Sequence, residues 1–207
     1  MLVNFDINMI KTPYYVVDER LLIKNLEILK TVSEQAGCKI LLAQKAFSMF
    51  AVYPLIRKYL AGTTASGLYE AKLGHEEMGG ETHIFSAAYN QDEFDEICEI
   101  CDHIVFNSFS QLEKYRDKVI RYGKEFGVRI NPEHSTQNNA IYDPCSKGSR
   151  LGVTLKNFRE DLLSGVSGLH FHTLCEQNSD DLVETLKVFE KNFGKYLHDM
   201  KWVNFGG

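Results

Sequence analysis

The chain has 207 residues, of which 44% are hydrophobic and 25% are charged, and its formal net charge is −5. This length allows one sizeable hydrophobic core, and the composition is that of an ordinary globular domain. The acidic balance, with no basic stripe, argues against nucleic-acid binding, and no apolar run is long enough to span a membrane. We therefore expect neither a nucleic acid nor a membrane as partner.

The N-terminus and the cysteines favour a cytoplasmic location. The opening residues "MLVNFDINMI" lack the basic region and apolar core of a secretory signal, and the cysteine count of five is odd. We expect these thiols to stay reduced. Cys98 and Cys101 have CxxC spacing, but they lie in a helix-like segment and no second pair completes a zinc site. The sequence therefore predicts no metal site.

Short strands alternate with helices along the whole chain. A strand at 13–18 precedes a helix at 19–37, whose apolar residues recur at helical spacing. The patterns that follow predict strands at 39–45, 63–66, 82–87, 103–106, 127–131, 165–173 and 201–207, with helices at 49–60, 68–79, 91–101, 110–125, 156–162 and 179–197. Residues 132–152 are rich in Asn, Ser, Gly and Pro and read as a functional loop, because they are too many for a simple connector.

This alternation predicts an α/β fold with parallel strands and covering helices. Two architectures fit the pattern: an open doubly wound sheet and a (β/α)8 TIM-type barrel. Leaving aside the strand at 13–18, seven strands are present, one fewer than a barrel needs. We therefore expect a piece of a longer chain, truncated before the eighth strand.

Polar residues and glycines gather where the predicted strands end, which is where parallel α/β folds place their chemistry. The residues at or just beyond these ends are Lys45, Ser66, Arg129, Asn131, His170, His172, Gly206 and Gly207. A lysine at a strand end is usually a surface residue, two histidines at i and i+2 can pair on a metal, and a Gly-Gly is usually only a turn. Lys45 nevertheless poses a question, because a buried ammonium is costly unless it reaches water or loses its proton.

Taken together, these residues suit pyridoxal 5'-phosphate. The aldehyde of this cofactor reacts with an unprotonated amine, which Lys45 can supply. Glycines after the seventh strand let the backbone approach an anion closely, and barrels commonly hold phosphate in the loops after strands seven and eight. A histidine on the sixth strand can support the flat ring of the cofactor.

Five segments resemble a known family: "LLAQKAFS", "ASGLYEAKLG", "HIVFNS", "GLHFHTLCEQ" and "KWVNFGG". Together they are similar to the carboxynorspermidine (carboxyspermidine) decarboxylases, pyridoxal-phosphate enzymes of the alanine racemase-like fold. The resemblance covers essentially the whole chain. It implies that residues 19–207 form an incomplete cofactor-binding (β/α) barrel and that residues 1–18 carry a strand of a C-terminal β-domain.

The resemblance also assigns roles to single residues. Lys45 matches the lysine that binds the cofactor covalently, His172 the histidine stacked on its ring, and Gly206 and Gly207 the first two glycines of a phosphate-binding Gly-Gly-Gly. Arg129 matches an arginine near the cofactor. The third glycine and the carboxylate that pairs with the pyridine nitrogen are absent, as are the family's substrate-binding residues.

By this resemblance the expected function is decarboxylation of carboxynorspermidine or carboxyspermidine to norspermidine or spermidine, by a homodimer. The 207 residues alone are expected to be inactive. The alternatives are a related enzyme such as diaminopimelate decarboxylase or an amino-acid racemase, a non-catalytic pyridoxal-phosphate carrier, and an open-sheet domain without a cofactor. The strand at 13–18 argues against the carrier, which has no β-domain.

Overall fold

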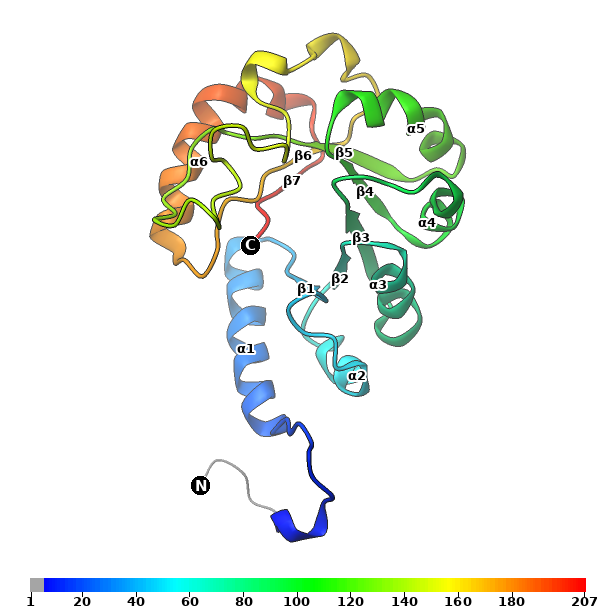
Figure 1. Ribbon diagram of the computed structural model, residues 1–207, viewed down its shortest axis with the longest axis vertical. Helices are drawn as coiled ribbons and strands as arrows, with labels where there is room; N and C mark the ends of the chain where they lie inside the picture. The colour runs from blue at the N-terminus through cyan, green and yellow to red at the C-terminus, as the bar shows by residue number, and fades with distance from the viewer. Residues whose placement is uncertain (1–5) are drawn as a thin grey trace.

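The computed structural model describes residues 6–207, and its centre is one curled sheet of parallel strands (Figure 1). The strands pair in chain order from β1 to β7. Their bounds are β1 Leu41–Ala43, β2 Gly62–Ala65, β3 Glu81–Phe85, β4 His103–Phe106, β5 Glu125–Arg129, β6 Gly168–His170 and β7 Trp202–Asn204. A doubly wound sheet reverses its strand order, whereas this sheet does not, so the prediction of barrel-type winding is confirmed and the open-sheet alternative is wrong.

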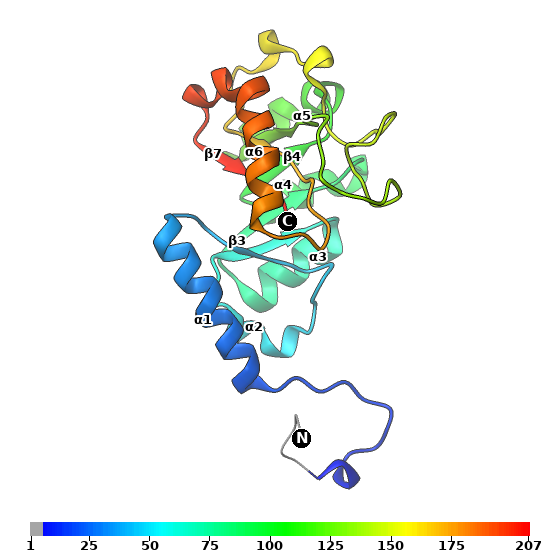
Figure 2. The ribbon, with the colours of Figure 1, turned by 90° about the vertical axis from the view of Figure 1, so that its left-hand side faces the viewer.

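Helices connect the strands and cover the outer face of the sheet (Figures 1 and 2). The α-helices are α1 Glu19–Ala36, α2 Tyr53–Ile56, α3 Leu68–Leu73, α4 Phe94–Ile100, α5 Phe109–Arg121 and α6 Ser179–Phe193. Short 3-10 helices lie at Ile7–Met9, Phe50–Val52, Gln91–Glu93, Leu155–Asn157, Glu160–Leu162 and Gly194–Asp199, and a π-helix lies at Gly74–Met78. None of the helices described is long and apolar enough to cross a membrane.

The longer helices begin where local side chains cap them, and α1 ends at a glycine. Asp18 accepts a hydrogen bond from the backbone of Arg20 at the start of α1, and Gly37 ends that helix in the left-handed conformation, at φ 64°. Asn178 and Asp181 form a capping box at the start of α6. Caps of this kind satisfy backbone groups that the helix itself leaves unpaired.

Alternate residues of each strand face the helices and form the hydrophobic core. Ile84, Ile104 and Val128 pack with α3, α4 and α5, while Leu169 packs with Phe189 and Phe193 of α6. A smaller cluster joins α1 and α2 through buried residues that include Leu26 and Tyr53. The remaining residues of each strand therefore face the concave interior.

The register arranges these interior residues in three layers. At the N-terminal ends of the strands, His83, His103 and Glu125 are direct neighbours on β3, β4 and β5. At the C-terminal ends, Arg129, His170 and Asn204 are neighbours on β5, β6 and β7. The middle layer runs across the sheet through Phe85, Val105, Gly127, Gly168 and Trp202. Such layering is typical of barrel interiors.

Several local predictions were wrong or too long. Residues 13–17 have no regular secondary structure, since no strand of the described sheet lies beside them to form a ladder. The helix predicted at 49–60 is a 3-10 turn followed by the four-residue α2, and the helix predicted at 156–162 is two 3-10 turns. The assignment of residues 1–18 to another domain remains a prediction, and residues 1–5 lie outside the described part.

Two glycines of the middle layer make room for the indole of Trp202. A methyl group at Gly168 would lie 2.1 Å from Cδ2 of Trp202, and one at Gly127 would lie 2.3 Å from its Cη2. We expect Gly168→Ala to destabilise the protein by roughly 1–3 kcal/mol, because overpacking forces either the indole or the strand to move. Urea unfolding followed by circular dichroism measures this change.

The matched control is Gly67→Ala. Gly67 has an extended backbone with φ −171°, and a methyl group there would meet no atom within 4 Å. Equal midpoints for Gly168→Ala and the unchanged protein would contradict the packing described.

Candidate active site

Lys45 lies at the mouth of the curled sheet, in the turn that follows β1. Its side chain is exposed, so the described residues do not bury its amine. The question raised by this lysine is thereby answered: it reaches water at the rim. Its positive charge nevertheless acts on both His170 and His172, which places all three residues at the same end of the interior.

His172 follows β6 by two residues and is half-buried at this rim. Burial lowers the pKa of His172 to about 4, helped by the positive charges of Lys45 and Arg129. The imidazole is therefore neutral at physiological pH. A neutral ring at this place offers a flat apolar face without adding a further positive charge.

Arg129 ends β5 and points into the interior, where only 4% of the residue is exposed. Its Nη2 donates to the backbone oxygen of His172 at 3.3 Å, and its guanidinium lies over the ring of Phe85 at 4.6 Å. Burial lowers the pKa of Arg129 to about 10, so the group stays charged near neutral pH. Among the described residues no carboxylate pairs with it, and its Nε has no hydrogen-bond partner.

Gly206 completes the rim just beyond β7. Its backbone has φ 71°, and a methyl group there would lie 2.6 Å from the oxygen of Phe171 and 2.8 Å from Nδ1 of His172. Only glycine suits both the conformation and the space. The amide of Gly206 donates to Oδ1 of Asn204 at 2.8 Å, so an anion bound to that amide would have to displace Asn204. At Gly207 a methyl group would meet nothing within 4 Å.

Two residues complete this region that the sequence did not assign to the site. His170 is fully buried, its ring meets the edge of Phe85 at 5.3 Å, and its Nδ1 lacks a hydrogen-bond partner in the described chain. Burial and the nearby positive charges hold the pKa of His170 well below its usual value. The sequence placed His170 among the strand-end residues without giving it a role, whereas nothing in the sequence pattern singled out Phe85.

Two other strand-end residues, Ser66 and Asn131, form hydrogen bonds within the segments that follow their strands. The amide of Ser66 donates to Glu70, and Asn131 accepts from the amide of Glu133.

The loop at 132–152 lies beside this rim. Gln177 Nε2 donates to Oγ1 of Thr136 at 2.7 Å, and Gln137 Nε2 donates to the backbone oxygen of Cys175 at 3.1 Å. These bonds tie the loop to the segment after β6. Cys145, from the middle of the loop, is close enough to Arg129 for their charges to interact. The loop therefore reaches the region that the strand ends define.

The rim residues fit pyridoxal 5'-phosphate by four features of this structure. Lys45 supplies an accessible amine, and His172 supplies a neutral ring. Arg129 is a buried cation with an unpartnered Nε, which favours an anionic ligand. The close backbone approach at Gly206 leaves no room for a side chain between the end of β7 and His172.

Known proteins are similar to this chain in both sequence and fold. No protein-family model matches the chain. A carboxynorspermidine/carboxyspermidine decarboxylase of Campylobacter jejuni is 44% identical over 198 residues, which are 96% of this chain and 51% of that protein. A carboxyaminopropylagmatine decarboxylase of Synechocystis is 39% identical over 207 residues, which are 100% of this chain and 54% of that protein. The resemblance inferred from the sequence is confirmed.

The solved structures that superpose on this chain are also decarboxylases. Carboxynorspermidine decarboxylase of Campylobacter jejuni, crystallised with norspermidine, superposes with a TM-score of 0.88 at 43% identity over 96% of this chain and 51% of that one. Diaminopimelate decarboxylase of Helicobacter pylori superposes with a TM-score of 0.77 at 18% identity over 97% of this chain and 56% of that one, and shares the fold. The chain spans about half the length of the relatives it matches.

The proximity of Lys45 to His172 can be tested by titration. In the cofactor-free protein we expect Lys45→Gln to raise the pKa of His172 from about 4, because a positive neighbour that disfavours the imidazolium is removed. The value should stay below 6.5, because burial is the largest cause of the shift and is retained. The ring-proton shift, followed by NMR against pH and assigned with His172→Asn, gives both values.

Lys58→Gln is the control, since Lys58 is also exposed but takes no part in the interactions that shift the pKa of His172. An identical His172 titration in Lys45→Gln and Lys58→Gln would contradict the geometry.

Proposed function

We propose that this chain supplies the cofactor-binding barrel residues of a pyridoxal-phosphate decarboxylase that acts on carboxynorspermidine or carboxyspermidine and forms norspermidine or spermidine. The observation that carries the proposal is the meeting of Lys45, Arg129, His172 and Gly206 at one rim, from β1, β5, β6 and β7. The similarity to relatives with this activity supports it.

Each rim residue has a physical task in this proposal. When bound, the cofactor withdraws electrons from the carbon that loses carbon dioxide. Lys45 would hold the cofactor through its amine. His172 would support the flat face of the ring, and its neutral state would keep that contact apolar. Arg129 attracts the anionic cofactor into the interior, and Phe85 holds the guanidinium in place.

A second candidate is decarboxylation of carboxyaminopropylagmatine, favoured by the relative that is 39% identical over all 207 residues. The two proposals require the same chemistry at Lys45 and differ only in the far end of the substrate. Diaminopimelate decarboxylase is less well supported, because at 18% identity it shares the fold alone.

Three further features belong to the same proposal. Residues 19–207 act as a barrel domain and residues 1–18 join a separate β-domain. The working form is a homodimer in the cytoplasm. The free thiols of the five cysteines fit a reducing compartment.

The role of Lys45 is tested by trapping. Borohydride reduction of the holoprotein, followed by digestion and mass spectrometry, should place the cofactor on the peptide containing Lys45. Lys45→Ala should abolish the label and the visible absorbance of the bound cofactor, because Lys45 is the lysine of the described chain whose charge acts on His170 and His172. Lys58→Ala is the control and should retain both. Label on another lysine of the unchanged protein would refute the assignment.

The substrate is tested by comparing rates on carboxynorspermidine, carboxyspermidine, carboxyaminopropylagmatine and meso-diaminopimelate with the holoprotein. We expect kcat/KM for one of the first two to exceed that for diaminopimelate by at least about a hundredfold, which corresponds to about 2.7 kcal/mol of transition-state binding. Highest kcat/KM on carboxyaminopropylagmatine would favour the second candidate. A preference for diaminopimelate would overturn both.

A further inference from the structure

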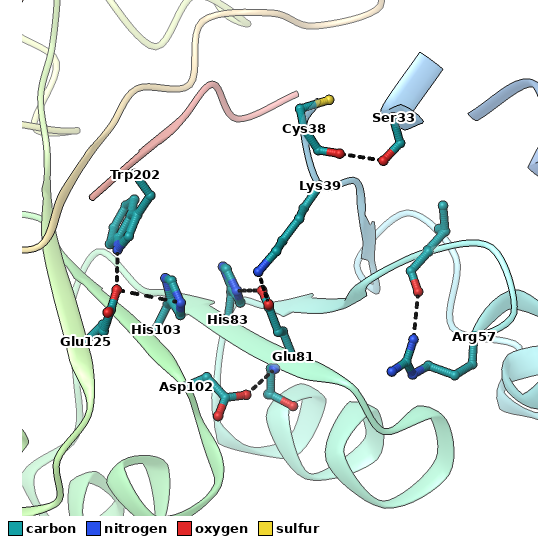
Figure 3. A network of polar contacts seen from close by, with 12 residues as sticks. Ser33, Cys38, Lys39, Arg57, Glu81, His83, Asp102, His103, Glu125 and Trp202 are labelled. Carbon is teal, nitrogen blue, oxygen red and sulfur yellow. Dashed lines mark hydrogen bonds and ion pairs between the residues drawn. The ribbon is translucent and has the colours of Figure 1, made fainter. Parts of the chain in front are cut away.

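A second cluster of chemically active side chains lies at the opposite end of the interior, in the layer formed by the N-terminal ends of the strands (Figure 3). One ligand atom each from Glu81, His83 and His103 can be chosen so that all three lie within 4.8 Å of one another. Oε2 of Glu125 lies 3.9 Å from Nε2 of His103. The register creates this cluster, because His83, His103 and Glu125 are direct neighbours on three adjacent strands.

We propose that Glu81, His83, His103 and Glu125 bind one divalent transition-metal ion of the zinc class. Two imidazoles and two carboxylates are a donor set that such ions accept in tetrahedral sites. The two carboxylates balance the double charge of the ion, so the ion and its four ligands together carry no net charge. Alkaline-earth ions fit this set less well, because they prefer oxygen donors alone.

The ligand side chains have to rotate to close on an ion, and Glu125 has to move furthest, because it lies outside the group of three whose ligand atoms are within 4.8 Å of one another. Zinc binds imidazole nitrogen and carboxylate oxygen at about 2.0–2.2 Å, so ligand atoms must approach to about 3.5 Å of one another. The rings of His83 and His103 are stacked, with centroids 4.1 Å apart and planes 8° apart. One ring has to turn for both nitrogens to face a common point. Nδ1 of His103 is buried and has no partner among the described residues, so a turn that presents it to the ion relieves an unsatisfied atom.

Residues outside the proposed ligand set already orient both carboxylates by hydrogen bonds. Lys39 donates to Oε1 of Glu81, leaving Oε2 directed at His83. Trp202 Nε1 donates to Oε2 of Glu125 at 2.9 Å, and Lys201 donates to its Oε1 at 2.7 Å. Second contacts of this kind fix ligand orientation in metal sites. The side chains of Lys39 and Lys201 are 67% and 69% exposed, so either ammonium can return to water when a metal ion takes its place.

The consequence of binding is structural. The ion would join β3, β4 and β5 at the end of the sheet away from Lys45, where barrels place residues that serve stability. This proposal is independent of the proposed decarboxylase function. A metal that binds the folded state alone raises the unfolding temperature in proportion to the logarithm of its free concentration.

Zinc binding to the chelator-stripped holoprotein, prepared without a polyhistidine tag, tests the site. Competition with a chromophoric chelator should show one ion per chain, and added zinc should raise the melting temperature. His83→Gln and His103→Gln should each weaken binding by at least about tenfold, since losing a ligand costs at least as much as losing an outer contact. His75→Gln is the control and should bind as the unchanged protein does, because His75 is exposed and outside the cluster.

A second readout needs no variant and so does not depend on their folding. The Co²⁺-substituted protein should show the visible bands of a four-coordinate nitrogen and oxygen site without a thiolate charge-transfer band. The proposal is overturned by three results: the absence of stoichiometric binding, equal affinity in His75→Gln and both ligand variants, or a thiolate band that assigns the ion to exposed cysteines such as Cys38 and Cys175.

Discussion

Parallel pairing in chain order is the constraint on which the rest of this structure depends. Each strand enters the sheet at one end and leaves it at the other, so residues that follow strands meet at one rim whatever their distance in sequence. Lys45 and Gly206 are brought to that rim from opposite edges of the sheet, β1 and β7. The outer helices enforce the pairing, because Ile84, Ile104 and Leu169 must face them to be buried.

The sequence predicted what depends on local pattern and failed where tertiary context decides. The strand alternation, the extent of α1 and the strand-end positions of Lys45, Arg129 and His172 follow from spacing alone. The strand predicted at 13–18 finds no neighbouring ladder in the described chain, and its pairing with a separate β-domain stays a prediction. The pairing of His83 with His103 could not be predicted, because register between strands is set by tertiary packing that neither segment determines by itself. The presence of a histidine in both "THIF" and "HIVF" was the one available signal.

The two ends of the interior differ in how their charges are balanced. At the N-terminal end, Glu81 and Glu125 pair with Lys39 and Lys201, so the cluster is close to neutral. At the rim, Arg129 is buried, pairs with no carboxylate of the described chain, and is held by the ring of Phe85 and a backbone oxygen. A buried cation costs free energy that these contacts offset only in part. An anionic ligand would supply the remainder, so this rim is preorganised for one.

The middle layer separates these two ends and lets them differ. Phe85 and Trp202 fill the interior between them, and the absence of side chains at Gly127 and Gly168 is what admits the indole. Trp202 also donates to Glu125, so its position couples the packing of the middle layer to the N-terminal cluster. Phe85 likewise couples the packing of the middle layer to the rim, because it contacts Arg129 and His170. Each aromatic ring contacts one polar end of the interior. The packed apolar layer therefore lies between the charged groups of the two ends. The chemistry proposed at Lys45 and the ion binding proposed at His83 therefore draw on different groups of one interior.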